Sequence, residues 1–246
     1  MASDADDAVL AAERLSKRFG GVVAADGVSF RLQRGELHCV IGPNGAGKST
    51  FFALLCGIIR PDAGRVLLRG QDVTHLPAFR RVRLGLGLTF QTNRTFHALT
   101  VAENLETARR GAASAGGDDS HFRTAYAAFD LAGSRDLAAR QLPHHQLQWL
   151  EICMALRPGP GVLLLDEPTA GMSPGETMHT AEVLQSLVRG GLAVVIVEHD
   201  VAFVRKVAER VTVLHQGAVF AEGSVDEVTS REDVRRIYLG RAGHAA

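Results

Sequence analysis

The sequence lacks a long hydrophobic run and an excess of charge of either sign. No apolar stretch approaches the roughly 20 residues of a membrane-spanning helix, and the acidic start, with Asp4, Asp6 and Asp7, is not typical of a signal peptide. Basic and acidic residues number 27 each. Because the charges balance, no overall field favours nucleic acid or an anionic membrane as a partner. We expect a chain on the cytosolic side of a membrane that does not bind nucleic acid.

Cysteine is scarce, which bears on the compartment. Cys39, Cys56 and Cys153 are widely spaced among apolar residues. This pattern favours buried free thiols in a reducing environment over disulfides or a metal site. The local cluster Arg80, Arg81 and Arg83 is interpreted as a solvated helix face.

What the sequence does have is a glycine-rich loop over residues 42–49. It is written Gly42-Pro43-Asn44-Gly45-Ala46-Gly47-Lys48-Ser49, the full pattern G-x-x-x-x-G-K-S. Apolar residues 37–41 before it predict a buried strand, and residues 50–58 after it predict a helix. Glycines let backbone N–H groups close around phosphate oxygens, and the helix N-terminus adds partial positive charge. We predict that Lys48 reaches the β- and γ-phosphates of a nucleoside triphosphate and that Ser49 binds Mg²⁺.

The rest of the chain predicts an α/β domain with a helical insert. Half-exposed antiparallel strands are expected at 9–14 and 28–32, and a strand at 65–68. Buried parallel strands are expected at 85–90, 162–165 and 192–197. Helices are expected at 101–110, 121–132, 147–156, 175–188, 201–210 and 231–239, with a hairpin at 211–221. We predict one domain over 8–242, with 8–91 and 158–242 as its α/β and β core, 92–157 as the helical insert, and 1–7 as a disordered tail.

Polar residues follow the predicted parallel strands, where ligands of such sheets lie. Asp166 suits a Mg²⁺ site, and Glu167 can polarise an attacking water. His199 can reach a γ-phosphate oxygen, and Gln91 offers an amide ligand for Mg²⁺. Asp-Glu as a solvated helix cap and His199 as a structural histidine are the plainer alternatives. Phe19 is either a platform for adenine or a turn residue covering the sheet.

In this order, these residues resemble an ATPase subunit of an ABC transporter, from about residue 10 to 240. The resemblance implies a P-loop NTPase fold with a parallel-sheet core, an N-terminal antiparallel β subdomain and a helical insert. It implies ATP and Mg²⁺ as ligands, and Lys48, Glu167 and His199 as catalytic residues. The nucleotide would contact Phe19, Gly42, Pro43, Asn44, Gly45, Ala46, Gly47, Lys48, Ser49, Thr50 and Gln91. The metal would be held by Ser49, Gln91 and Asp166.

Within that family, the chain resembles the ATPases of permeases for branched-chain amino acids and urea. The segments that carry this are Arg18-Phe19-Gly20-Gly21, Thr89-Phe90-Gln91-Thr92, Glu198-His199-Asp200 and Ile237-Tyr238-Leu239-Gly240. Two others, Gln148-Trp149-Leu150-Glu151-Ile152 and Ala170-Gly171-Met172, tilt the resemblance towards urea. The resemblance implies a second ATPase subunit, two transmembrane permease subunits that dock on the helical insert, and indirectly a periplasmic or extracellular solute-binding protein. It implies a peripheral position on the cytoplasmic face of the bacterial membrane.

The chain departs from the family where members carry Leu-Ser-Gly-Gly-Gln, or Leu-Ser-His-Gly-Gln in urea-type members. Here the signature segment is Leu142-Pro143-His144-His145-Gln146. The family serine and glycines bind the γ-phosphate of the nucleotide on the opposite subunit, whereas Pro143 has neither hydroxyl nor N–H. His145 adds a Cβ where backbone must approach phosphate closely. Imidazolium donors can replace part of this loss. Ser173 stands where many members carry the D-loop aspartate.

These departures favour an asymmetric heterodimer in which the phosphate loop of this chain works with the intact signature of a partner. The function expected from the sequence is ATP hydrolysis that powers an importer for urea. The alternatives are the same role for branched-chain amino acids, or a regulatory module that binds ATP with little turnover.

Overall fold

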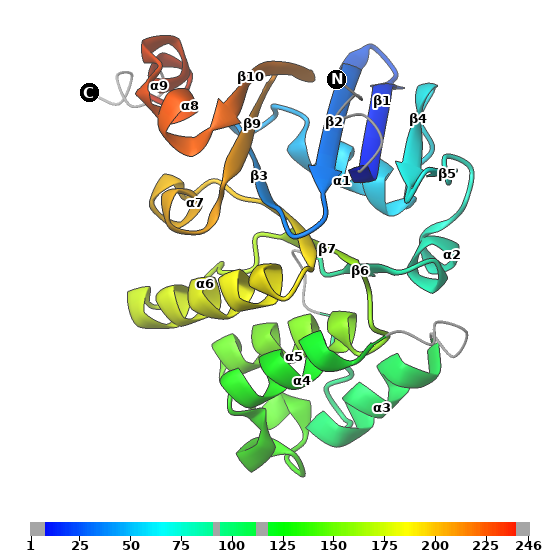
Figure 1. The fold of residues 1–246 in the computed structure, drawn as a ribbon, viewed down its shortest axis with the longest axis vertical. Helices are drawn as coiled ribbons and strands as arrows, with labels where there is room; N and C mark the ends of the chain where they lie inside the picture. Colours follow the sequence, from blue (N-terminus) through cyan, green and yellow to red (C-terminus); the bar gives the residue numbers. More distant parts are fainter. Residues whose placement is uncertain (1–7, 91–93, 112–117, 240–246) are drawn as a thin grey trace.

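The protein is described here from a computed structural model, in which residues 8–90, 94–111 and 118–239 are described. Its strands gather in one half, and helices α3 (Val101–Gly111), α4 (Ser120–Ala128) and α5 (His144–Leu156) gather in the other (Figure 1). Short 3-10 helices at Leu131–Ser134 and Ala139–Gln141 lead into α5. Among the described residues, no helix is long and apolar enough to cross a membrane.

The central sheet has six strands in the order β10-β9-β3-β8-β7-β6. Neighbouring strands from β9 to β6 pair in parallel, and β10 pairs antiparallel with β9. The strands span β3 Leu37–Ile41, β6 Leu86–Leu88, β7 Val162–Asp166, β8 Ala193–Val197, β9 Arg210–His215 and β10 Ala218–Ser224. The expected parallel core is therefore confirmed, and β3 has the expected bounds.

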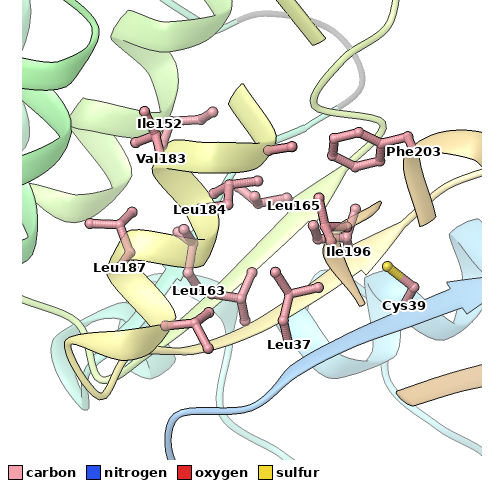
Figure 2. Packing of buried hydrophobic residues seen from close by; sticks show 14 of the residues in the cluster. Leu37, Cys39, Ile152, Leu163, Leu165, Val183, Leu184, Leu187, Ile196 and Phe203 are labelled. Atoms are coloured by element: carbon pink, nitrogen blue, oxygen red, sulfur yellow. The ribbon is translucent and has the colours of Figure 1, made fainter. Parts of the chain in front are cut away.

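Both faces of this sheet are covered, which explains why its inner strands are continuously apolar. Leu163 and Leu165 of β7 join the hydrophobic cluster beneath α6 (Pro174–Arg189) and α7 (Val201–Val207), as Figure 2 shows for α6. Val162 and Leu164 join a second cluster with α1 (Lys48–Cys56) on the opposite face. Alternate side chains of one strand thus enter two cores.

A second sheet, antiparallel and of order β2-β1-β4-β5, packs over α1. Its strands span β1 Ala8–Phe19, β2 Val22–Gln33, β4 Ala63–Leu68 and β5 Gln71–Asp72. Phe30 of β2 meets Phe51 of α1 edge to face, with ring centroids 5.6 Å apart. This contact joins the antiparallel sheet to the helix that follows the phosphate loop. The expected antiparallel β subdomain is confirmed.

Helix α5 begins at His144, earlier than the sequence predicted. Pro143 is its N-cap residue with an extended conformation, φ −62° and ψ 158°, which a proline adopts without strain. Trp149 of α5 donates its indole N–H to Thr180 Oγ1 of α6 at 2.9 Å, which ties the helical half to the sheet half. Two C-terminal helices are α8 (Val225–Ser230), which the sequence did not predict, and α9 (Glu232–Leu239), which it did.

The arginine cluster on α2 (Ala78–Arg83) corrects one expectation. Arg80 and Arg83 are exposed, but Arg81 is only 1% exposed. Its guanidinium donates to the carbonyl oxygens of Leu54 and Leu55 at 2.8 and 2.7 Å, and of Thr74 at 3.0 Å. Arg81 therefore donates to two carbonyls in the last turn of α1, where helical i→i+4 partners are missing. All three cysteines are buried and free, as expected.

Candidate functional site

The phosphate loop lies between β3 and α1, as its flanking residues predict. Gly42 and Gly47 have φ of 155° and 100°, and a Cβ on either would come within 2.3 Å of a backbone oxygen, of Leu214 or of Ala24. Glycine is thus required at both positions because backbone passes so close. Beside the loop is an open cavity of about 460 Å³, lined by Val22, Val23, Ala24, Asn44, Gly45, Ala46, Gly47, Lys48, Ser49, Thr50 and Glu167.

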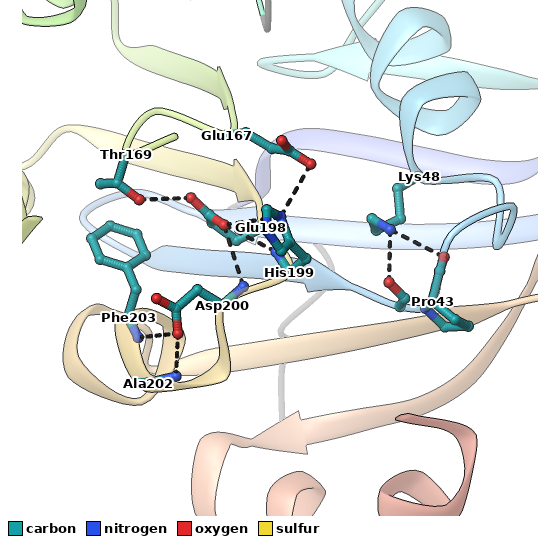
Figure 3. A network of polar contacts seen from close by, with 10 residues as sticks. Pro43, Lys48, Glu167, Thr169, Glu198, His199, Asp200, Ala202 and Phe203 are labelled. Atoms are coloured by element: carbon teal, nitrogen blue, oxygen red, sulfur yellow. Dashed lines mark hydrogen bonds and ion pairs between the residues drawn. The ribbon is translucent and has the colours of Figure 1, made fainter. Parts of the chain in front are cut away.

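Lys48 supplies a largely buried cation to this cavity. Its Nζ donates to the carbonyl oxygens of Gly42 at 2.7 Å and Pro43 at 3.1 Å (Figure 3). Burial lowers the pKa of Lys48, and the carboxylates of Glu167 and Asp166 oppose that shift. The N-cap residue of α1 is Gly47, so no side chain caps the first N–H groups of the helix. A buried ammonium beside uncapped N–H groups fits a polyphosphate.

Asp166 ends β7 and has a perturbed carboxyl group. Burial raises its pKa to about 6, and the nearby carboxylates of Glu167 and Glu198 add to that shift, while Lys48 opposes it. A divalent cation would offset such crowding of negative charge, and a carboxylate with the Ser49 hydroxyl is a suitable donor set for Mg²⁺. The residues present therefore fit the metal that the sequence predicts.

Glu167 and His199 come together from the ends of two neighbouring strands, β7 and β8. Glu167 Oε1 lies 3.2 Å from His199 Nδ1 (Figure 3). The backbone of Glu167 has φ 48°, and its N–H donates to the Val197 carbonyl oxygen at 2.9 Å. This left-handed turn takes the Glu167 side chain out of the strand alternation and into the lining of the cavity.

Glu198 is a site residue to which the sequence reasoning gave no role. Its side chain is 2% exposed; Oε1 accepts the Thr169 hydroxyl at 2.9 Å, and Oε2 accepts the backbone N–H of His199 at 3.0 Å. Asp200 caps α7 by accepting the N–H groups of Ala202 and Phe203 (Figure 3). The two acidic neighbours of His199 in the sequence, Glu198 and Asp200, therefore fix the backbone before and after it. An acidic residue directly after a strand of apolar residues was the signal available in the sequence.

One predicted nucleotide contact, Phe19, lies apart from this geometry. Phe19 is 50% exposed and is not part of the cavity lining; the Lys17 ammonium lies 5.6 Å from its ring centroid. Gln91 lies outside the described residues, so its expected role in binding Mg²⁺ stays a prediction. Residues 44–50 and Glu167 line one cavity, and His199 contacts Glu167, whereas Gly42, Pro43 and Asp166 are not part of that lining.

The signature segment lies elsewhere in the chain, at the start of α5. Leu142 is buried and Pro143 is exposed. His144 Nε2 lies 3.0 Å from the Ala170 carbonyl oxygen, and His145 Nδ1 lies 2.6 Å from Glu176 Oε1. The Gln146 side chain accepts the Ser134 hydroxyl at 3.3 Å.

The partners of the two histidines are near the start of α6. Ser173 is the N-cap residue of that helix and forms a reciprocal capping box with Glu176. The His145 ring also packs edge to face on Trp149, with centroids 4.7 Å apart. The two imidazoles therefore contact separate groups of this same chain.

The chain is similar to known proteins in sequence and in structure. The model of a family described as "ABC transporter" matches residues 25–170. The chain is 32% identical to the high-affinity branched-chain amino acid transport ATP-binding protein BraF of Pseudomonas aeruginosa and 36% identical to LivG, of the same description, from Salmonella typhimurium. Each alignment covers 95% of this chain and 98% of the relative. A crystal structure of the ADP conformation of an ATP-binding cassette of an ABC transporter matches with a TM-score of 0.84 and 29% identity, over 95% of this chain and 99% of that one.

Proposed function

Since the chain belongs to the ABC transporter family of ATP-binding proteins, whose ATP hydrolysis is coupled to transport, we propose that it powers an importer for branched-chain amino acids. The cavity that Lys48, the phosphate loop and Glu167 share carries the ATPase part of this proposal. The solute comes from BraF and LivG, which align with the chain almost end to end. Urea, the solute favoured by the sequence, is not supported by these relatives, and the alternative expectation fits them better.

In the proposed mechanism, Lys48 binds the β- and γ-phosphates of ATP and stabilises the charge that develops during phosphoryl transfer. Ser49 and Asp166, with Gln91, would hold Mg²⁺, which supplies further neutralisation of phosphate charge when bound. Glu167 orients the attacking water and accepts its proton. His199 contacts Glu167 through its Nδ1, and the rest of its exposed ring would reach the γ-phosphate. Phe19, at the end of β1, would stack on the adenine.

A surface formed by α2, β6 and the helical half is suited to the permease subunits. A depression of about 300 Å³, which we call the α2–α5 groove, is lined by Phe79, Val82, Leu86, Gly87, Leu88, Phe90, Arg94, Ala108, Gly111, Glu151, Met154, Ala155 and Pro158. Phe79 is 56% exposed there. Exposed apolar surface with a charged rim is typical of protein interfaces. We propose that a cytosolic segment of a permease subunit docks here, which makes the chain a peripheral protein on the cytoplasmic face of the membrane.

The signature segment supports pairing with a different ATPase subunit. Pro143 has no hydroxyl and no N–H to give, and His145 is paired with Glu176. The phosphate loop of this chain would then hydrolyse ATP against the intact signature of its partner, and the second site would be weak. The solute-binding protein would take part only through the permeases.

The experiment that tests the function is uptake of labelled leucine, with labelled urea in parallel, at low external concentration. The strain lacks this chain and is complemented with wild type or with Lys48→Ala. We expect leucine uptake to disappear on deletion and to return only with wild type. If the deletion abolishes urea uptake instead, branched-chain amino acids are the wrong solute. If the deletion changes neither leucine nor urea uptake, the chain powers transport of neither solute.

The signature departure also supports a second candidate, a regulatory module that binds ATP with little turnover. Steady-state hydrolysis by the purified chain, with and without its permeases, separates the two candidates. A rate that stays near background in the assembled complex, with ATP bound, would favour the regulatory module.

A further inference from the structure

A carboxylate lies where the α2–α5 groove meets the core. Glu151, on the inner side of α5, is 6% exposed among buried neighbours Leu150, Ile152 and Cys153. Burial raises its pKa to about 7, although backbone N–H groups and the Arg94 charge oppose that shift. Burying an apolar side chain of similar size at this position would cost less free energy than burying a carboxylate. Packing alone therefore does not explain why a glutamate is there.

The partners of Glu151 lie on the segment that follows β6. Its Oε1 accepts the backbone N–H of Phe90 at 3.4 Å, and the backbone N–H of Arg94 also bonds to the carboxylate. The Arg94 guanidinium in turn lies 3.6 Å from the centroid of the Phe90 ring. Phe90 and Arg94 both line the groove. One carboxylate thus fixes two groove residues to α5.

Helix α5 also connects this point to the signature segment. Glu151 lies about 10 Å along the helix from His144, at roughly 1.5 Å per residue. Between them, Trp149 bonds to Thr180 of α6, and His145 pairs with Glu176 at the start of the same helix. A shift of the groove wall that moves Glu151 would therefore move a helix bound to the segment where α6 begins.

We propose that Glu151 is a positioning residue that couples occupation of the α2–α5 groove by a permease to ATP hydrolysis, a role that rests on the function proposed above. The carboxylate transmits the displacement because it bonds to the backbone of two residues that line the groove, Phe90 and Arg94. An apolar residue would fill the same space without holding either N–H group.

The test compares Glu151→Leu and Glu151→Gln with wild type, and Glu182→Gln serves as the matched control because Glu182 is an exposed carboxylate on the neighbouring helix α6. Basal hydrolysis by the isolated chain, hydrolysis in the complex with permeases, solute moved per ATP, and Tm are measured. We expect Glu151→Leu to keep or raise Tm and to keep basal hydrolysis within about twofold. We expect its stimulation by permeases to fall about tenfold or more, corresponding to about 1.4 kcal/mol of coupling.

Glu151→Gln is nearly isosteric and retains one acceptor, so it should fold even if the leucine variant does not, and we expect a partial loss of stimulation. Wild-type stimulation in both variants would overturn the coupling role and leave the proposed function intact. A parallel fall of Tm and stimulation would also overturn it, in favour of a purely structural role. If wild type itself is not stimulated by its permeases, the proposed function fails, and this inference fails with it.

Discussion

Helix α1 begins at the phosphate loop and helix α5 at the signature segment, the two segments expected to contact phosphate. The N-termini of the two helices differ. Neither helix has a side-chain cap, but α1 follows Gly47 and opens onto the cavity beside Lys48. Helix α5 follows Pro143, and its first two side chains, His144 and His145, contact Ala170 and Glu176 of the same chain. Both helices begin with backbone N–H groups that have no partner within the helix. At α1 these groups face a cavity that can hold a ligand, whereas at α5 the first side chains contact other residues of the same chain.

The local charges of the two helix ends also differ. At α1 the side chain is an ammonium, which adds to the positive end of the helix dipole. At α5 the Glu176 carboxylate lies against His145, and Ser173 and the two histidines hold its pKa below the ordinary value of 4.5. A lasting negative charge at that point opposes an incoming γ-phosphate. Under the proposed function, this chain keeps one half of a phosphate site and has lost much of the other half.

The largest effect should come from removing the cation at the α1 end. Lys48→Ala deletes the ammonium that the loop carbonyls hold, and we expect nucleotide affinity to fall at least about 100-fold, because charge-assisted contacts to phosphate are lost. Calorimetric titration with a non-hydrolysable ATP analogue measures this. Lys206→Ala, an exposed lysine on α7, is the control. Unchanged affinity in Lys48→Ala would show that the phosphates bind elsewhere.

The next effect separates binding from chemistry at the same end. Glu167→Gln keeps the shape of the side chain next to His199 but removes the proton acceptor. We expect turnover to fall by about 10²- to 10⁴-fold with little change in ATP affinity. Single-turnover hydrolysis in the assembled complex measures the chemical step. A normal rate would assign the base to another residue.

Restoring the family's serine and glycine at the start of α5 should allow both helix ends to contact phosphate. The double substitution Pro143→Ser and His145→Gly gives back a hydroxyl and a close backbone approach, and it leaves Glu176 without its imidazole partner. We expect turnover of the assembled complex to rise about threefold to tenfold, which corresponds to about 0.7–1.4 kcal/mol, the net contribution of roughly one hydrogen bond. The double variant with Lys48→Ala is the control, because it should lose that gain. If wild type and the double variant have equal turnover, Pro143 and His145 do not limit the rate.

The same comparison explains what the sequence could predict. The phosphate loop and the meeting of Glu167 with His199 follow from local pattern, since glycines precede a helix and both acidic and imidazole groups end parallel strands. Helix α8 was missed although its signal is local, a capping box of Ser224 with Glu227. The buried state of Arg81 has no local signal. It depends on carbonyls of α1, distant in sequence, that become partners only in the folded chain.

The start of α5 was predicted too late for a related reason. Two histidines and a proline resemble a loop in sequence, whereas His144 and His145 are helical and contact Ala170, Glu176 and Trp149. The role of Glu198 was missed because a carboxylate after a strand usually meets solvent, whereas here it meets Thr169 and the backbone of His199.

The smallest expected effect concerns the carboxylate that distinguishes the α5 end. The Glu176 carboxylate accepts the backbone N–H of Ser173, while Ser173 Oγ accepts the backbone N–H of Glu176. The bonds to Ser173 and the pairing with His145 lower the folded-state pKa of Glu176. A lowered carboxyl pKa means stability that is present above the unfolded value and lost as pH falls through the folded value. Glu176→Gln should therefore lower Tm by about 1–2 °C at pH 7. That difference should shrink towards zero as pH falls below 4.5, the ordinary pKa of the group.

Scanning calorimetry across this pH range measures the effect, and Glu182→Gln, an exposed carboxylate further along α6, should show no such pH-dependent difference. If the difference between wild type and Glu176→Gln persists unchanged in acid, the charge of Glu176 is not its source. The contrast between the two helix ends would then rest on Pro143 and His145 alone, because only their missing N–H, missing hydroxyl and added Cβ would remain to weaken the α5 end.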